Sequence, residues 1–251
     1  MEAIDTAVIM AGGKGTRLSE FTKSMPKPLL PVGGIPILVH IIRHYRKYGV
    51  DKFIIPVGYL GEMVFMFFTT YGKILITGEI HCDYEFEGCT VTVVDTGEET
   101  KTGGRLLRLE HFLPEVFYMT YGDGISNVNI KSLGLAIENT DNDVLGIVTA
   151  THPPSRFGTM EIDDMGFVRT FREKPTDYSW INGGFWALKK DVLDFIMGDE
   201  DSFEDDTMPL LCIKPRILAH LYVGYWHCID TEKDLIQAEE DYHNGKFLLG
   251  G

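Results

Sequence analysis

The residues best suited to chemistry lie near the amino terminus. Glycines are mixed with cationic and hydroxyl side chains in the order Ala11-Gly12-Gly13-Lys14-Gly15-Thr16-Arg17-Leu18, and Lys27 follows nine residues later. Glycine lets the backbone approach a ligand, and neighbouring backbone amides can form a concave site for an anion. Positive charge, set against one nearby acid at Glu20, comes from Lys14, Arg17, Lys23 and Lys27. The segment favours a bound polyphosphate, although a structural tight turn fits the same glycines.

Two common phosphate-binding patterns do not fit this segment. Gly12 and Gly13 are not followed by Gly-Lys-Ser/Thr at the offset of a P-loop, and the third glycine of the dinucleotide fingerprint would fall at Leu18. The apolar run 6–10 just before the glycines is short, which is typical of a buried parallel strand.

Two later loops carry polar residues at predicted strand ends, where open α/β sheets bind their ligands. The first runs from Asp95 to Leu106 and offers the hydroxyls of Thr100 and Thr102 and the amide of Gly103, which suit a base or a phosphate. A helix cap with ordinary turn residues fits it equally well. In the second, Asp123 stands between Gly122 and Gly124. This carboxylate is placed to hold a metal beside a phosphate, or else belongs to an Asp-Gly turn.

Composition narrows the class of protein. The net charge of −14 disfavours nucleic acid and anionic membranes as partners, and it means that a phosphate site must gather its cations locally. We find no apolar run long enough for a membrane span and no basic leader. The four cysteines form no C-x-x-C pair, so we interpret them as reduced thiols of a cytoplasmic protein. Zinc spacing is absent, which disfavours a metal site made of His81, Cys82 and Cys89.

The elements that must position these residues alternate between strand and helix. We expect strands at 53–57, 116–121 and 144–150, and helices from near Pro36, over 61–71 and over 129–139. This order predicts a mainly parallel sheet with helices on both faces. Beyond Pro153-Pro154, residues 158–162 and 167–171 predict a hairpin in a β-rich portion that covers one side of the cleft. We expect residues 199–206 to form a solvated acidic loop, and Thr231 to cap a last helix.

The run AGGKGTRL…PKP resembles the signature of the sugar-1-phosphate nucleotidylyltransferases. The later motifs are together similar to those of the glucose-1-phosphate cytidylyltransferases, and they occur in order from residue 7 to about residue 240. They are Asp95-Thr96-Gly97, Thr102-Gly103-Gly104-Arg105-Leu106, Tyr121-Gly122-Asp123-Gly124, Arg156-Phe157-Gly158, Glu173-Lys174-Pro175, Ile181-Asn182-Gly183-Gly184-Phe185 and Asp230-Thr231.

This resemblance implies a Rossmann-like nucleotidyltransferase fold in a single domain, 1–251. The nucleotide part would span about 1–124, and the acceptor and metal part about 125–251. The reaction implied is transfer of CMP from CTP to a sugar 1-phosphate with release of pyrophosphate, in a homo-oligomer. The catalytic residues would be Arg17, Lys27 and Asp123, and Mg²⁺ would be held by Asp123 and Asp230. Nucleotide binding would involve Ala11, Gly12, Gly13, Lys14, Gly15, Thr16, Thr100, Thr102, Gly103, Arg105 and Gly122, and the acceptor would meet Glu173, Lys174, Asn182 and Gly183.

Three departures from the family pattern leave alternatives open. The segment between Tyr84 and Thr90 is short, the residues before Asp230 read Trp-His-Cys-Ile, and the chain stops soon after its last helix. The first and third affect the expected oligomer contacts. Together they admit another phosphorylated acceptor, including a non-sugar phosphate. A nucleotide-sensing subunit without turnover is the remaining alternative.

Overall fold

The protein is described here by a computed structural model that covers residues 4–15, 18, 22–153, 158–173 and 179–247. Three residues with predicted site roles, Thr16, Arg17 and Lys174, lie outside the described residues. None of the helices formed by the described part of the chain is long and apolar enough to span a membrane.

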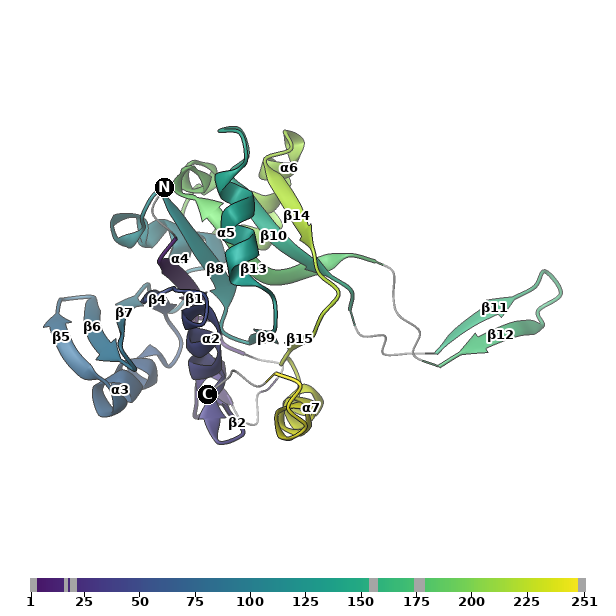
Figure 1. The fold of residues 1–251 in the computed structure, drawn as a ribbon, viewed down its shortest axis with the longest axis horizontal. Coiled ribbons are helices and arrows are strands. Elements are labelled where there is room, and N and C mark those ends of the chain that lie inside the picture. Colours follow the sequence, from purple (N-terminus) through teal and green to yellow (C-terminus); the bar gives the residue numbers. More distant parts are fainter. Residues whose placement is uncertain (1–3, 16–17, 19–21, 154–157, 174–178, 248–251) are drawn as a thin grey trace.

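One mixed sheet of nine strands organises the described residues (Figure 1). Strands β13 and β6 run against the direction of the other strands, so the predicted mainly parallel sheet is confirmed. The spatial order is β14 (Ile217–Leu221), β10 (Gly146–Thr151), β13 (Ile181–Lys189), β8 (Val116–Tyr121), β1 (Thr6–Met10), β4 (Lys52–Val57), β7 (Cys89–Asp95), β6 (His81–Phe86) and β5 (Lys73–Thr77).

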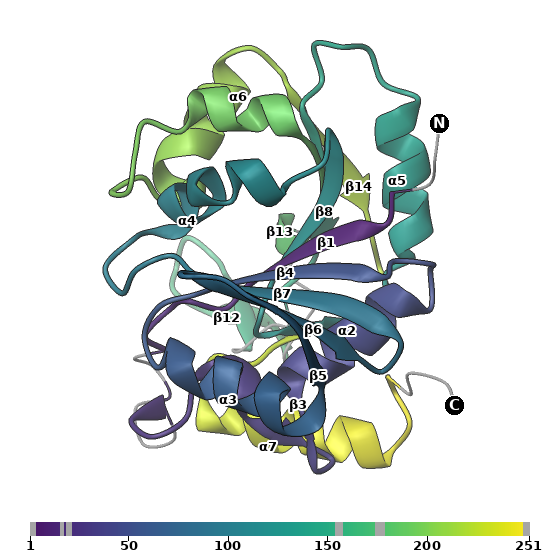
Figure 2. The ribbon, with the colours of Figure 1, turned by 90° about the vertical axis from the view of Figure 1, so that its left-hand side faces the viewer.

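Strand β1 lies inside the sheet and is buried on both faces. Its side chains alternate, as they must in a strand: Ala7 and Ile9 enter one core, and Val8 and Met10 enter the other. Figure 2 shows the covering helices on opposite sides of the sheet. On one side are α2 (Ile37–Arg46), α3 (Gly61–Tyr71), α5 (Ile130–Glu138) and α7 (Glu232–His243); on the other are α4 (Thr102–Arg108), α6 (Met208–Ile213) and the short helices η3 (Glu110–Phe112), η4 (Lys190–Phe195) and η5 (Phe203–Thr207).

Local signals placed most of these elements correctly. Helix α2 starts directly after Pro36, and α3 has the predicted bounds. Thr231 caps α7 in a capping box with Asp234, which stabilises the helix start immediately beyond Asp230.

Three short strand pairs lie outside the main sheet. Strands β2 (Pro31–Val32) and β3 (Ile35–Pro36) form a tight hairpin before α2, and β9 (Gly124–Ser126) pairs antiparallel with β15 (Trp226–Cys228). The predicted hairpin of the second half consists of β11 (Thr159–Ile162) and β12 (Val168–Arg172). Figure 1 shows that this hairpin extends away from the main sheet, although we expected it to cover one side of the cleft.

Helix α2 buries a histidine that makes stability depend on pH. Only 5% of the His44 surface is exposed, and Nε2 lies 2.9 Å from the carbonyl oxygen of Val128, so Nε2 donates as the neutral ring. Burial lowers the pKa of His44 to about 4. The unfolded chain has a His pKa of about 6.5, so it binds a proton between pH 6.5 and 4 while the folded chain does not.

We therefore expect the His44 contribution to stability to be complete above pH 6.5 and to be lost as the pH falls toward 4. At pH 4.5 the loss should be ~2.5 kcal/mol relative to pH 7. His44→Gln keeps an N–H donor and should remove that part of the pH dependence in urea unfolding. The exposed His111 serves as control. Equal pH slopes for His44→Gln and His111→Gln would show that His44 does not act in this way.

Candidate active site

A cleft of about 790 Å³ opens at the carboxyl ends of the central parallel strands. One wall is the glycine segment after β1. Tyr121, the last residue of β8, forms another part with Gly122 and Asp123. The loop after β7 and the residues around η5 complete the lining. Ligands of open α/β sheets bind at this edge, so the geometry agrees with the predicted position of the site.

Lys27, Asp123 and Asp230 meet at one end of the cleft. The ammonium nitrogen of Lys27 lies 2.8 Å from Oδ2 of Asp123 and 2.7 Å from Oδ1 of Asp230. The lysine side chain is 12% exposed and each carboxylate side chain 28%. Burial by itself lowers the pKa of Lys27, but the attraction of Asp123 and Asp230 outweighs it, so the pKa is raised. Lys27 is therefore a permanent cation that bridges two carboxylates.

The β9–β15 pair brings these distant residues together. Asp123 precedes β9 and Asp230 follows β15, and the amide of Ile229 donates to the carbonyl of Asp123 at 3.0 Å. The amide of Asp230 donates to the carboxylate of Asp234 in the first turn of α7. Backbone hydrogen bonds thus hold both aspartates in place without occupying their side chains.

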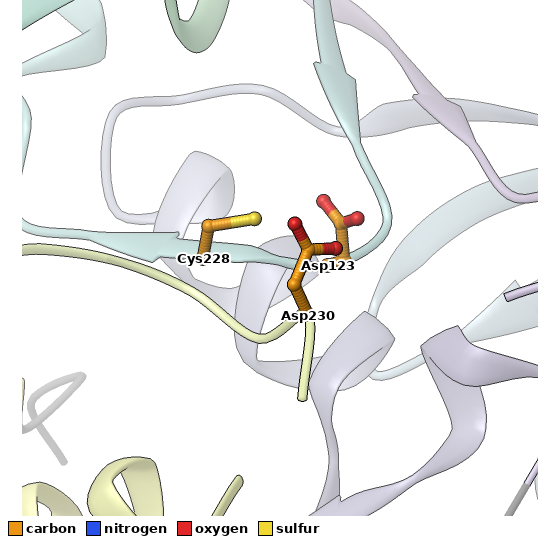
Figure 3. A group of neighbouring side chains, drawn as sticks. All are labelled: Asp123, Cys228 and Asp230. Atoms are coloured by element: carbon orange, nitrogen blue, oxygen red, sulfur yellow. The ribbon is translucent and has the colours of Figure 1, made fainter. Parts of the chain in front are cut away.

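The same pair adds a third donor beside the carboxylates, the thiol of Cys228 (Figure 3). One ligand atom from each of Asp123, Cys228 and Asp230 lies within 4.8 Å of the others. Burial, with the two carboxylates, raises the pKa of the Cys228 thiol. Carboxylate oxygens are the ligands that Mg²⁺ prefers, so Asp123 and Asp230 fit the predicted metal, whereas the sulfur of Cys228 is not a ligand that Mg²⁺ favours. Cys228 was not among the predicted site residues.

The glycine segment is held from behind by Arg105. This side chain is 4% exposed, and its guanidinium donates to the carbonyls of Gly12, Val57, Gly97 and Glu98 and to the hydroxyl of Thr96. A Cβ atom at Gly12 would overlap the guanidinium. Burial lowers the pKa of Arg105. Arg105 therefore joins the two predicted nucleotide loops and places a positive charge under them.

The other predicted residues of the glycine segment stand along the same wall. Ala11, Gly12, Gly13, Lys14 and Gly15 all line the cleft. The ammonium group of Lys14 lies 2.7 Å from the carboxylate of Glu99 on the opposite loop, an exposed ion pair at the rim. Such pairs contribute little to stability, so Lys14 can exchange Glu99 for a ligand phosphate at small cost.

The acidic run 199–206 belongs to the cleft, so the expectation of a solvated surface loop was wrong. Glu204 in η5 accepts hydrogen bonds from the hydroxyls of Thr102, at 2.6 Å, and of Tyr121. The backbone carbonyl of Asp201 accepts from the amide of Gly103 at 2.9 Å. Two of the predicted nucleotide-binding groups are therefore engaged within the protein. Ser202, which caps η5, was the local signal for a structured loop.

Thr100 and Gly122 also line the cleft. Thr100 is 8% exposed and lines the cleft beside Lys101. The amide of Gly122 donates to the carbonyl of Met10 at 2.9 Å, and a Cβ atom there would come within 2.8 Å of Pro28. The close packing of β1, β8 and the Lys27 turn, η2 (Lys27–Leu29), requires glycine at this position.

The predicted acceptor residues are less closely gathered. Asn182 is exposed near Tyr121, and its side-chain oxygen accepts from the amide of Gly184 at 2.8 Å. The carbonyl of Gly183 accepts from the indole of Trp226 at 2.7 Å. Glu173 is exposed at the end of β12 and does not line the cleft formed by the described residues.

Comparison with known proteins decides the family. The family model described as nucleotidyl transferase matches residues 6–245. This chain belongs to the nucleotidyl transferase family. A probable glucose-1-phosphate cytidylyltransferase of Bacillus subtilis (strain 168) is 36% identical over 249 residues, covering 96% of this chain and 97% of that protein. The glucose-1-phosphate cytidylyltransferase of Salmonella typhi is 38% identical over 252 residues, covering 96% of each.

Solved structures of low sequence identity share the nucleotidyl transferase fold. HddC from Yersinia pseudotuberculosis aligns with a TM-score of 0.68 at 22% identity, covering 95% of this chain and 100% of that chain. The inositol-1-phosphate CTP transferase from T. maritima aligns with a TM-score of 0.66 at 14% identity, covering 97% and 98%. The predicted Rossmann-like nucleotidyltransferase fold is confirmed.

The inward direction of Arg105 gives a testable prediction. Arg105→Lys keeps the charge but cannot reach five acceptors, and each buried acceptor left unpaired costs ~1–3 kcal/mol. We expect the free energy of unfolding to fall by ~2–4 kcal/mol and nucleotide binding to weaken about tenfold, measured by urea unfolding and by CTP titration. Arg108→Lys is the matched control, because Arg108 lies in α4 like Arg105 but forms an exposed ion pair with Asp199. Equal effects of the two variants would contradict the role of Arg105.

Proposed function

We propose that this nucleotidyl transferase moves the cytidylyl group of CTP to the phosphate of a sugar 1-phosphate, with glucose 1-phosphate as the first candidate acceptor, and releases pyrophosphate. Relatives named as glucose-1-phosphate cytidylyltransferases align with 96% of this chain, which supports this choice of substrates. The observation that carries the proposal is the cationic Lys27, held between two carboxylates at the end of a cleft lined by a glycine segment.

The reaction needs alignment and charge neutralisation more than proton transfer. An oxygen of the acceptor phosphate, already ionised at neutral pH, attacks the α-phosphorus of CTP. One P–O bond forms there, the bond to the departing pyrophosphate breaks, and no proton has to be removed from the nucleophile. Holding two anions in line supplies ~7–11 kcal/mol toward the barrier.

Each part of the site then has a defined task. The amides of Gly12 and Gly13 approach the nucleotide, and Arg105 keeps their segment in position. Lys27 neutralises charge that develops on the phosphates in the transition state. Mg²⁺, held by Asp123 and Asp230, would supply further neutralisation when bound, as divalent ions do in phosphoryl-transfer sites. Arg17, Thr16 and Lys174 are assigned to triphosphate and acceptor binding on the resemblance alone.

The test is a matrix of nucleotides against phosphorylated acceptors, with pyrophosphate release as the readout. We expect the highest kcat/KM for CTP with glucose 1-phosphate, and low turnover with UTP, dTTP or GTP. Preference for a non-sugar phosphate would change the acceptor but retain the reaction. Tight CTP binding without pyrophosphate release for any acceptor would instead indicate a nucleotide-sensing subunit.

We further propose that the protein is a homo-oligomer, and the exposed hairpin supports this. Met160 pairs with Phe171 across β11 and β12, and Ile162 pairs with Val168. These four side chains are 53–60% exposed. A two-stranded hairpin by itself is only marginally stable in water, and an exposed apolar patch is typical of a surface that contacts another chain. Light scattering should give a mass above 28.3 kDa for the wild type and a smaller one for Phe171→Lys, whereas a wild-type monomer would contradict the assembly.

A cytoplasmic location is part of the same proposal. CTP and sugar phosphates are cytoplasmic metabolites in this chemistry, and all four cysteines are free thiols, as expected in a reducing compartment.

A further inference from the structure

The sulfur of Cys228 lies within 4.8 Å of a carboxylate oxygen of each proposed metal ligand, Asp123 and Asp230. Asp123 and Asp230 lie beyond the same end of the antiparallel β9–β15 pair, the end at which Gly124 is aligned with Cys228. One donor atom of each of the three residues falls within 4.8 Å of the others (Figure 3). Across the described part of the chain, this is the one group of three such side chains that is close enough to hold an ion.

The ammonium group of Lys27 shows that a cation is already held at this point. It contacts both carboxylates at 2.7–2.8 Å, so their oxygens converge on a single position. A divalent ion that enters without nucleotide must displace this ammonium group. Mg²⁺ gives up its water reluctantly and prefers oxygen ligands, so it gains little from the exchange. An ion that binds sulfur gains an additional strong ligand there.

We propose that Cys228 makes this a mixed oxygen and sulfur site, which takes a thiophilic divalent ion of the Zn²⁺ class in the nucleotide-free enzyme. The inference rests on the metal ligands of the proposed function, Asp123 and Asp230. On binding, a bond forms between the metal and the sulfur, and the thiol proton passes to the buffer. No electron is transferred. Asp123 and Asp230 would hold Mg²⁺ only together with CTP, whose triphosphate could draw Lys27 away from the carboxylates.

Such an ion would act as an inhibitor that competes with the productive arrangement. With the ion bound to both carboxylates and the sulfur, Asp123 and Asp230 are no longer available to Mg²⁺ bound with CTP. Because of the sulfur of Cys228, the nucleotide-free site would bind soft metal ions more tightly than hard ones such as Mg²⁺.

The experiment is a titration of the nucleotide-free protein with Cd²⁺, followed by ultraviolet thiolate-to-metal charge-transfer absorption and by proton release. We expect one ion and about one proton per chain. Cys228→Ser should remove the absorption band and weaken Cd²⁺ binding at least tenfold. Cys82→Ser is the matched control, because Cys82 is half-buried like Cys228 but lies on β6. Cys82→Ser should leave both signals unchanged.

Two results would overturn the proposal: no charge-transfer band in the wild-type protein, or a band that persists in Cys228→Ser. Neither depends on catalysis. Mg²⁺-dependent pyrophosphate release by the wild-type protein, measured in parallel, tests the proposed function separately. A missing band with normal turnover would refute the soft-metal site alone, whereas the band without turnover on any acceptor would refute the proposed reaction alone.

Discussion

Replacing Lys27 by alanine should lower kcat/KM by ~10²–10³, because under the proposed mechanism the site loses a cation that is directed at charge formed in the transition state. The same change leaves Asp123 and Asp230 facing each other without the ammonium group that now separates them. Their repulsion then opposes the approach of the triphosphate as well. Pyrophosphate release with CTP and glucose 1-phosphate, at saturating Mg²⁺, measures the effect.

Lys131→Ala is the appropriate control, since Lys131 is an exposed lysine in α5 that does not line the cleft. It should retain activity within about a factor of three, as is usual for surface substitutions. A cooperative thermal transition in Lys27→Ala would show that the fold survives. Turnover of Lys27→Ala close to that of Lys131→Ala would remove Lys27 from the mechanism.

The sequence was sufficient for features that depend on neighbouring residues. The fully buried β1 and the glycines after it follow from a short apolar run and a turn. Helix α3 and the capping box of α7 follow from periodicity and from the residues that start a helix. These signals extend over a few residues, and the sequence displays them directly.

Contacts between distant residues were beyond such reasoning. Lys27 is 96 residues from Asp123 and 203 from Asp230, and the β9–β15 pair that unites them is three residues long in each strand. The acidic run 199–206 was predicted to be a solvated loop, but it lines the cleft. Its charges suggested exposure to solvent. Instead, the carbonyl of Asp201 and the carboxylate of Glu204 accept hydrogen bonds from α4, which lies about 100 residues earlier in the chain.

Arg105 illustrates a further limit of sequence reasoning. A cation in a glycine-rich loop suggests contact with phosphate, and the resemblance assigned it to the nucleotide. In the structure its guanidinium is turned toward backbone carbonyls of two loops and of Val57, the last residue of β4. The residue type of Arg105 correctly indicated a positive charge beside these loops. The direction of its side chain depends on Gly12 and Gly58, because a Cβ atom at either position would overlap the guanidinium.

Asp123→Asn should abolish Mg²⁺-dependent turnover while the protein remains folded. Asparagine keeps the size of the side chain and one oxygen, but it removes the charge that would hold the ion. It also removes one of the two ion pairs of Lys27. The backbone carbonyl of Asp123, which accepts from Ile229, is unaffected, so the β9–β15 pair should persist. Mg²⁺ titration of activity, with Asp141→Asn as an exposed control, measures the effect.

Combining the change with Asp230→Asn makes the test sharper. If both carboxylates serve one ion and one lysine, the residual turnover of the double variant should be close to the residual turnover of Asp123→Asn alone, because residues that act as a unit are not additive. Independent roles would instead multiply the two losses. Retained Mg²⁺-dependent turnover in Asp123→Asn would place the metal elsewhere, and multiplicative losses would mean that the aspartates do not share a ligand.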